Sequence, residues 1–445
     1  MNEDAVMECI EATGTLHMDH YGGRLPFVCA GAGPGYLELV RIEAGRVGRR
    51  FRVVDAGSTY GTTSLGVAHP ALLSSITDVL EFGAATDELV VPERSRMLID
   101  LLGKEGYWAS QFPFGEYHAS GRNSGSEGVE LALAIVGAYL ENRGSSERSR
   151  RDTVLVFEGA WHGWTSGAAA LARPSRGGAF GRMTIPFGNE EVLERAFSEA
   201  GNRLAAVFVE PIQGDAGIIV PPSGYLRSLA AYCAKYGALL VADETLTYAR
   251  TGDFFGMRDE QGPVPSDITI VGKALGAGII PTSIVIARRH LGPRAGAAVA
   301  TFDLRAFDCR VIRTVARTIA ESRLHEHVSN LGTILSRGLT EIVARRPSIF
   351  RETRGVGFLH GLELQPKVAE VAECFRTHLI EEGVYLEIML GAGERSCGAR
   401  AIGRTLRVAP PLVTTIEQIE TIFDRIEAGA RSFRVPLHAS KRSRK

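Results

Sequence analysis

The chain has 445 residues, of which 45% are hydrophobic and 23% are charged, and its formal net charge is −1. This length allows a large core and more than one domain. The balanced charge gives no indication of binding to nucleic acid or to a membrane surface, and no apolar run approaches the roughly 18 residues of a membrane span.

The cysteines are scattered, and no two of them have the short spacing of a zinc site or a redox pair. We therefore expect reduced, structural thiols, as in a cytoplasmic protein. The acidic N-terminus, "MNEDAVMECIEATG", contains no hydrophobic signal-peptide segment, which also favours a cytoplasmic location.

The expected elements begin with a glycine-rich segment. Residues 1–50 are expected to be irregular, 51–57 to form a strand and 70–102 to be mainly helical. Further on, short runs of apolar, β-branched residues alternate with helical segments such as 223–237, a pattern typical of strands buried on both faces. The expected strands are 153–157, 205–209, 238–242, 268–271 and 282–287.

From residue 305 onward the pattern changes to long helices, two strand-like stretches and a final helix. The sequence therefore predicts an α/β protein whose large domain, 76–304, has a mostly parallel sheet covered by helices. Residues 305–445 are expected to form a smaller α+β domain, with 1–75 as an N-terminal segment belonging to it.

A helix is expected to begin within "NSGSEGVELALAIVGAYL", where Ser124, Gly125 and Ser126 stand. Serine is a favoured helix cap, and capping alone would account for this motif. The free N–H groups of a helix start, beside a glycine that allows close approach, also bind phosphate. Ligands of open α/β sheets bind beyond the carboxyl ends of the strands, which is where this motif is expected.

Aromatic and acidic residues follow three of the expected strands. Trp161 and His162 come after the first, where a ring either packs in a loop or stacks on a planar ligand. Glu210, with Asp215 nearby, and Asp243 follow two others. Buried carboxylates need a cationic or hydrogen-bonding partner. Because the nearby histidines lack the spacing of metal ligands, we expect no metal site.

Lys273 follows the strand at 268–271, in "SDITIVGKALGAG". Such a lysine either extends out of the strand end and pairs with an acid, or lies partly desolvated with a lowered pKa. In the second case its neutral amine can attack a carbonyl group and form a Schiff base.

These features together match the needs of pyridoxal 5′-phosphate, and their order resembles that of the class III pyridoxal-phosphate aminotransferases of fold type I. The resemblance covers roughly residues 50–430. It rests on "NSGSE", "WHG", "VEPIQGDAG", "ADETLTYARTG", "VGKALGAG" and "LRVAPPL". Some features resemble the branch of this family that contains glutamate-1-semialdehyde aminomutase.

The resemblance implies a role for each matching position. Lys273 would form the Schiff base and then move a proton of the substrate, and Asp243 would keep the ring nitrogen protonated. Trp161 and Thr245 would lie against the two faces of the ring, and the serine-rich loop would bind the phosphate. The implied cofactor-binding residues are Ser124, Gly125, Ser126, Trp161, His162, Glu210, Asp243, Thr245, Lys273 and Thr301.

The resemblance also implies a homodimer and a substrate-binding pair. Thr301 matches a threonine that reaches the phosphate of the neighbouring subunit, which would place the sites at a subunit interface. Arg407 matches an arginine that binds a substrate α-carboxylate, a task suited to its bidentate geometry. Asp215 stands where several members have a glutamate that pairs with this arginine and gates it.

Several positions depart from the family pattern. The usual stacking tyrosine is Trp161, the usual valine is Thr245, and Leu246 replaces a glutamine. We expect an aminotransferase that moves an amino group from an amino acid or amine to a keto or aldehyde acceptor. The alternatives are an isomerase (an aminomutase or racemase), a decarboxylating member, or a non-catalytic relative, which would have lost Lys273 or Asp243.

Overall fold

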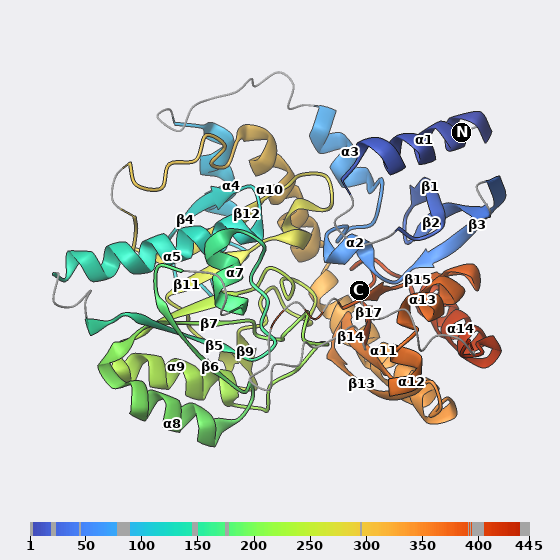
Figure 1. Cartoon of the computed structure of the whole chain (residues 1–445). Coiled ribbons are helices and arrows are strands. Elements are labelled where there is room, and N and C mark those ends of the chain that lie inside the picture. Colours follow the sequence, from blue (N-terminus) through green and yellow to red (C-terminus); the bar gives the residue numbers. More distant parts are fainter. Residues whose placement is uncertain are drawn as a thin grey trace.

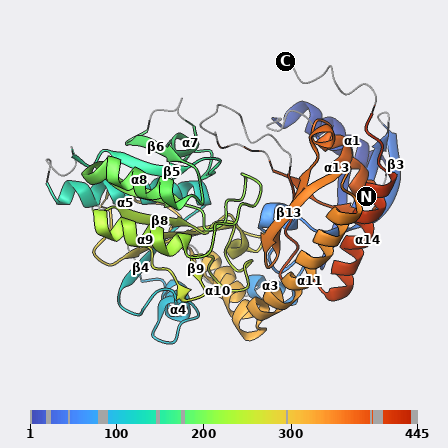
Figure 2. The same ribbon diagram turned by 90° about the horizontal axis from the view of Figure 1, so that it is seen from below.

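The computed structural model of the chain describes residues 3–18, 24–43, 46–77, 90–144, 150–173, 178–293, 296–389, 391, 393 and 405–436. These residues form two lobes (Figure 1). Figure 2 shows the N-terminal segment, in blue, beside the C-terminal segment, in orange and red, within one lobe. Among the described residues, no helix is both long and apolar enough to cross a membrane.

The larger lobe is built on a seven-stranded sheet with the order β4-β12-β11-β8-β7-β5-β6. All neighbouring strands from β11 to β6 are parallel, whereas β12 is antiparallel to both of its neighbours. This confirms the predicted α/β fold with a mostly parallel sheet. The strands are β4 (Tyr117–Arg122), β5 (Thr153–Phe157), β6 (Gly181–Ile185), β7 (Leu204–Val209), β8 (Leu239–Asp243), β11 (Ile268–Val271) and β12 (Ser283–Arg288).

Helices cover both faces of this sheet, and the alternation of side chains along β5 shows why its apolar run is continuous. Val154 and Val156 pack in the core under α5 and α7, whereas Leu155 and Phe157 pack in the opposite core under α8 and α9. A strand buried on both faces needs apolar residues at every position. The covering helices are α5 (Gly125–Asn142), α7 (Ser166–Ala172), α8 (Glu190–Ala200) and α9 (Tyr225–Tyr236).

The smaller lobe contains two four-stranded sheets, which are joined by consecutive short strands. Strand β15 extends the N-terminal sheet, pairing in parallel with β3, and β16 then pairs with β17 in the C-terminal sheet. The first sheet is β1 (Phe27–Gly33), β2 (Tyr36–Glu43), β3 (Arg46–Asp55) and β15 (Val384–Tyr385). The second is β13 (Phe350–Val356), β14 (Leu359–Leu364), β17 (Thr405–Val408) and β16 (Glu387–Ile388).

The remaining helices surround these sheets or lie between the lobes. Helix α10 packs against both α3 and α4 at the edge of the larger lobe. The domain limits proposed at residues 75 and 304 stay predictions. The other elements are α1 (Glu3–Leu16), α2 (Ser58–Gly61), α3 (Pro70–Thr77), α4 (Pro92–Leu102), η2 (Gly201–Arg203), β9 (Arg258–Asp259), β10 (Gly262–Pro263), η3 (Lys273–Gly276), α10 (Ala306–Glu321), α11 (Leu324–Arg345), α12 (Pro366–Ala369), α13 (Ala372–Glu381) and α14 (Ile416–Ser432).

The expectation of irregular structure over residues 1–50 is wrong. This segment contains α1, β1, β2 and the start of β3. Glycine-rich "FVCAGAG" in β1 has little strand propensity of its own, and it becomes a strand because it pairs along its length with β2. Of the stretch predicted to be helical, 70–77 and 92–102 are helices, and 78–89 lies outside the described residues.

Candidate active site

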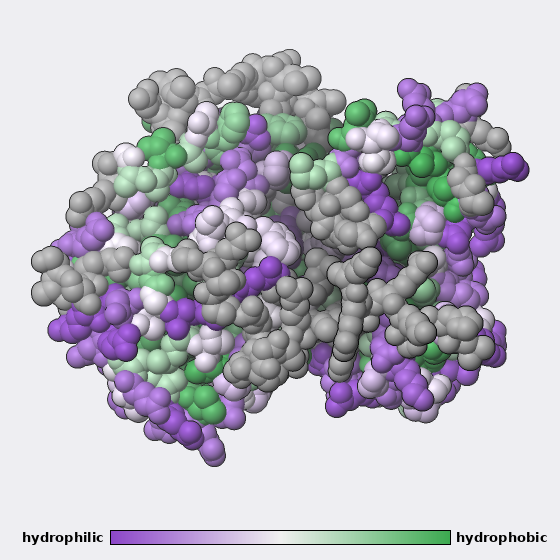
Figure 3. Space-filling view, viewed as in Figure 1, coloured by the Kyte–Doolittle hydropathy of each residue, from purple (hydrophilic) through white to green (hydrophobic). Residues whose placement is uncertain are grey.

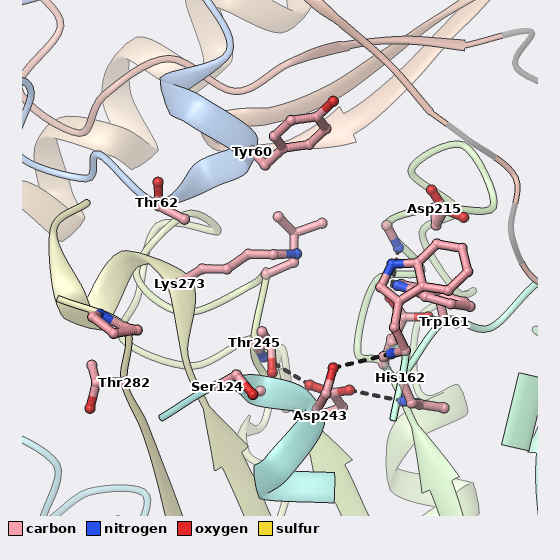
Figure 4. A pocket seen from close by; sticks show the side chains of 18 of the residues that line it. Tyr60, Thr62, Ser124, Trp161, His162, Asp215, Asp243, Thr245, Lys273 and Thr282 are labelled. Atoms are coloured by element: carbon pink, nitrogen blue, oxygen red, sulfur yellow. Dashed lines mark hydrogen bonds and ion pairs between the residues drawn. The ribbon is translucent and has the colours of Figure 1, made fainter. Parts of the chain in front are cut away.

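A cavity of about 440 Å³ lies beyond the carboxyl ends of the parallel strands and is closed on its other side by the smaller lobe (Figure 4). Neighbouring strands β11, β8, β7 and β5 each contribute residues that follow their last positions. Eleven of the twelve candidate site residues line this cavity: Ser124, Gly125, Ser126, Trp161, His162, Glu210, Asp215, Asp243, Thr245, Lys273 and Arg407. Thr301 is exposed and is not among the lining residues.

Lys273 lies two residues beyond β11, at the start of η3, with a left-handed backbone (φ 40°). Its side chain extends toward the centre of the cavity, with Tyr60 and Thr62 on one side and Asp243 and Thr245 on the other (Figure 4). Burial, and after it the positive charge of Arg407, lower the pKa of the Lys273 ammonium from 10.5 to about 8. At pH 7 about a tenth of this amine is therefore neutral and nucleophilic, far more than for an ordinary lysine.

Asp243 is the last residue of β8 and is 5% exposed. His162 Nδ1 donates to its Oδ2 at 2.8 Å, and the backbone N–H of Thr245 donates to its Oδ1 at 3.1 Å. Burial opposes a charge on His162, but the hydrogen bond to Asp243 and the charges of Asp243 and Glu210 together raise the pKa of the imidazole. The histidine thus fixes the orientation of the carboxylate.

Glu210, which follows β7, fixes two loops beside Asp243, the one that contains Trp161 and the one that contains Gly214. Its carboxylate accepts hydrogen bonds from the backbone N–H groups of Trp161 and Gly214, both at 2.9 Å. Burial, together with the nearby charge of Asp243, raises the pKa of Glu210 to about 7. This carboxylate therefore positions backbone rather than presenting a free charge, and it sets the place of the Trp161 ring.

The start of α5 forms the floor of the cavity. Ser124 Oγ caps the helix by accepting from the N–H of Glu127 at 3.2 Å, and Ser126 Oγ accepts from the N–H of Trp164 at 3.2 Å. A Cβ at Gly125 would lie 2.8 Å from Thr245 Cγ2, so this position requires glycine. The first N–H groups of a helix have no partner within the helix and attract anions.

Two buried polar atoms that line the cavity have no hydrogen-bond partner within the described part of the chain. They are His162 Nε2 and Thr245 Oγ1. Buried polar groups are rarely left unsatisfied in a folded protein, so both atoms indicate a bound polar ligand. A neutral amine, a buried carboxylate, a helix start and an indole around one cavity fit the aldehyde, ring nitrogen, phosphate and ring of pyridoxal phosphate.

Arg407, on β17, forms a buried ion pair that the sequence did not indicate. Its Nε donates to Glu387 Oε2 at 3.1 Å, its Nη2 contacts the same oxygen, and Glu387 Oε1 accepts from the backbone N–H of Tyr60. The guanidinium also lies over the Tyr60 ring, 5.5 Å from its centroid. The pairing of Arg407 with Asp215 stays a prediction; Asp215 and Trp161 both line the cavity (Figure 4).

The sequence also did not indicate that Tyr60 and Thr62 line the cavity. Ser58, Thr59 and Tyr60, in α2, all have positive φ angles of 46–56°, and Gly61 follows at 82°. Three consecutive non-glycine residues in this region are sterically costly, and no sequence pattern indicated them. The turn directs Tyr60 and Thr62 into the cavity.

Comparison with known proteins agrees with this geometry. The family model for class III aminotransferases matches residues 48–429. An aminotransferase from Bacillus anthracis is 20% identical with a TM-score of 0.80, and the match covers 97% of this chain and 100% of that one. An ornithine aminotransferase from Toxoplasma gondii ME49 is 22% identical with a TM-score of 0.79, and the match covers 97% of this chain and 95% of that one. An acetylornithine aminotransferase from Elizabethkingia anophelis is 24% identical with a TM-score of 0.78, and the match covers 97% of this chain and 100% of that one. At these identities the structures establish the shared fold, and the family model establishes the kind of enzyme. The chain therefore belongs to the class III aminotransferases, which are enzymes that use pyridoxal phosphate.

Proposed function

We propose that this enzyme moves an amino group between an amino acid or amine and a keto or aldehyde acceptor, with Lys273 holding the cofactor through a Schiff base. The observation that carries this proposal is the pairing of β8 with β11. Ile270 is the register partner of Asp243, so a carboxylate and the amine of Lys273 meet at the same end of neighbouring strands. A nucleophilic lysine and a buried acid in one cavity are the minimum that pyridoxal-phosphate chemistry needs.

When bound, pyridoxal phosphate supplies an aldehyde carbon that receives the amino group and a ring that withdraws electrons from the reacting carbon. Lys273 Nζ would take the proton from that carbon and deliver it to the former aldehyde carbon of the cofactor, a role that its pKa of about 8 supports. The Asp243 carboxylate would hold the proton of the ring nitrogen, and His162 holds the carboxylate in place. Trp161 and Thr245, which line the cavity, would lie against the ring faces, and the start of α5 with Ser124, Gly125 and Ser126 would bind the phosphate.

The test of this proposal is a visible absorption band of the purified protein. We expect the band in the native chain and in Lys235→Ala, whose lysine is exposed on α9, and we expect its loss in Lys273→Ala. Addition of an amino donor should then convert the native band to the pyridoxamine form. Absence of the band under cofactor saturation would refute the proposal, and a band that no donor alters would favour an isomerase.

We also propose a homodimer with active sites at the subunit interface and a cytoplasmic location. Exposed apolar side chains on α3, α4 and the loop before α10 support the dimer; these are Leu73, Ile99, Val299 and Phe302. In the region of α3 and α4, Figure 3 shows hydrophobic residues scattered among hydrophilic ones. Thr301 stands among them and would reach the cofactor phosphate of the other subunit. A monomeric mass in solution would refute this arrangement.

A further inference from the structure

One edge of the Arg407 guanidinium, which lines the cavity, is already paired with a carboxylate of the protein. Arg407 and Glu387 are direct cross-strand partners on β17 and β16, and their side chains are 4% and 0% exposed. The Nε and Nη2 groups, which form one side of the guanidinium fork, are both directed at Glu387 Oε2. A protein carboxylate therefore already occupies a position from which an arginine binds substrate carboxylates.

The arrangement of Glu387 is that of a fixed residue and not of a movable gate. It belongs to a strand whose register sets it opposite Arg407, and its second oxygen accepts from the backbone of Tyr60. A Cβ at Gly57 would lie only 3.2 Å from Glu387 Cδ, so the carboxylate is packed closely. Moving it would leave a buried charge without a partner, which is strongly unfavourable.

Behind the Arg407–Glu387 pair lie a further arginine and a further acid, Arg250 and Asp55. Arg250, fully buried, donates to Ser58 Oγ at 2.8 Å and to the carbonyl of Gly61 at 3.0 Å. Asp55 accepts from the backbone N–H of Ser58 at 2.8 Å. Two arginines, Arg250 and Arg407, thus face two acids, Asp55 and Glu387, which interact electrostatically with one another. The formal charges of these four side chains therefore sum to zero.

We propose that Glu387 permanently occupies the carboxylate-binding edge of Arg407, so that the preferred substrates carry no carboxylate on the reacting carbon. They are primary amines and aldehydes, and the exchange R–CH2–NH3+ + R′–CHO → R–CHO + R′–CH2–NH3+ is balanced in atoms and charge. This inference rests on the proposed aminotransferase function and names its substrate class. Glu387 is then a specificity-determining residue that acts through Arg407.

The first test uses the native holoenzyme and pairs of donors that differ only in the carboxylate. The pairs are L-alanine with ethylamine, L-norleucine with pentylamine and L-phenylalanine with 2-phenylethylamine. In each pair that reacts, conversion to the pyridoxamine form should have a rate constant about tenfold or more higher with the amine than with the amino acid. The reason is that the amino acid gains no charge-assisted hydrogen bond from Arg407. Equal or faster reaction of the amino acids would overturn the inference and leave the aminotransferase function intact.

The second test is Glu387→Gln, which removes the charge and keeps the size. This variant should raise the rate constants of the amino acids relative to those of their amines by about 10–100-fold, since one charge-assisted contact is worth about that factor. The matched control is Glu427→Gln, which breaks an ion pair between Glu427 of α14 and Arg346, the residue after α11 (2.8 Å), and it should leave the ratio unchanged. An unchanged ratio in Glu387→Gln would overturn the inference. If no donor of either class reacts although the cofactor band is present, the proposed function fails, and this inference fails with it.

Discussion

The lowered pKa of Lys273 leads to a quantitative prediction for the binding of the cofactor. The amine must be neutral to attack the aldehyde, and burial with the charge of Arg407 lowers its pKa to about 8. At pH 7 a group with this pKa is about 10% neutral, whereas one with the ordinary value of about 10.5 is about 0.03% neutral. Lys273 should therefore react about 300-fold faster at pH 7 than an unperturbed lysine of equal intrinsic reactivity.

The assay is reconstitution of the cofactor-free protein, followed by the growth of the absorption band between pH 6 and pH 10. We expect the rate to rise about tenfold per pH unit at low pH and to level off above pH 8, when the amine is mostly neutral. Lys273→Ala provides the background from other lysines. A rate that still climbs tenfold per unit between pH 9 and pH 10 would show that the pKa is not lowered and would refute the argument.

Three further predictions concern the frame around the site. Gly125→Ala should weaken cofactor affinity by about tenfold or more, because the added Cβ meets Thr245; titration with the cofactor measures this effect. The control Gly137→Ala lies in open space on the same helix and should stabilise the protein by about 0.5–1 kcal/mol, which thermal unfolding measures. Glu244→Ala should lower the free energy of unfolding by about 1–3 kcal/mol, because the backbone N–H groups of residues 256 and 257 lose a buried acceptor; a change below 0.5 kcal/mol in denaturant unfolding would contradict this. Burial lowers the pKa of His360 from 6.5 to about 4, so on acidification the unfolded state binds a proton before the folded state does. The contribution of His360 to stability should therefore be lost as the pH falls from about 6.5 to about 4. His360→Gln should flatten the slope of unfolding free energy against pH in that window.

Most of the larger sheet could be predicted because its buried strands are continuous runs of apolar, β-branched residues. The run 268–271 is entirely apolar or β-branched, and the structure places β11 at the same residues. Strand β6, "GRMTI", was missed because it is an edge strand with only Ile185 fully buried, so its sequence lacks a continuous apolar run. Burial on both faces leaves a pattern in the sequence, and pairing at an edge leaves much less.

The candidate site was predictable for a similar reason. Lys273 and Asp243 each follow a recognisable strand, and parallel strands bring their carboxyl ends to one edge of the sheet. Glu387 could not be found in this way, because its meeting with Arg407 depends on the register of two consecutive short strands, which no local pattern in the sequence specifies. A glutamate in "GVYLEIML" has no local feature that distinguishes it from a surface acid.

The left-handed turn at residues 58–60 has a consequence for protein engineering. Each of these non-glycine residues stores about 1 kcal/mol of conformational strain, which the contacts of the turn with Asp55, Arg250 and Glu387 help to maintain. Thr59 is exposed, and its side chain is not needed to line the cavity. An asparagine or glycine at that position would release part of the strain while Tyr60 keeps its place, so thermostability could be gained there without altering which substrates the enzyme selects.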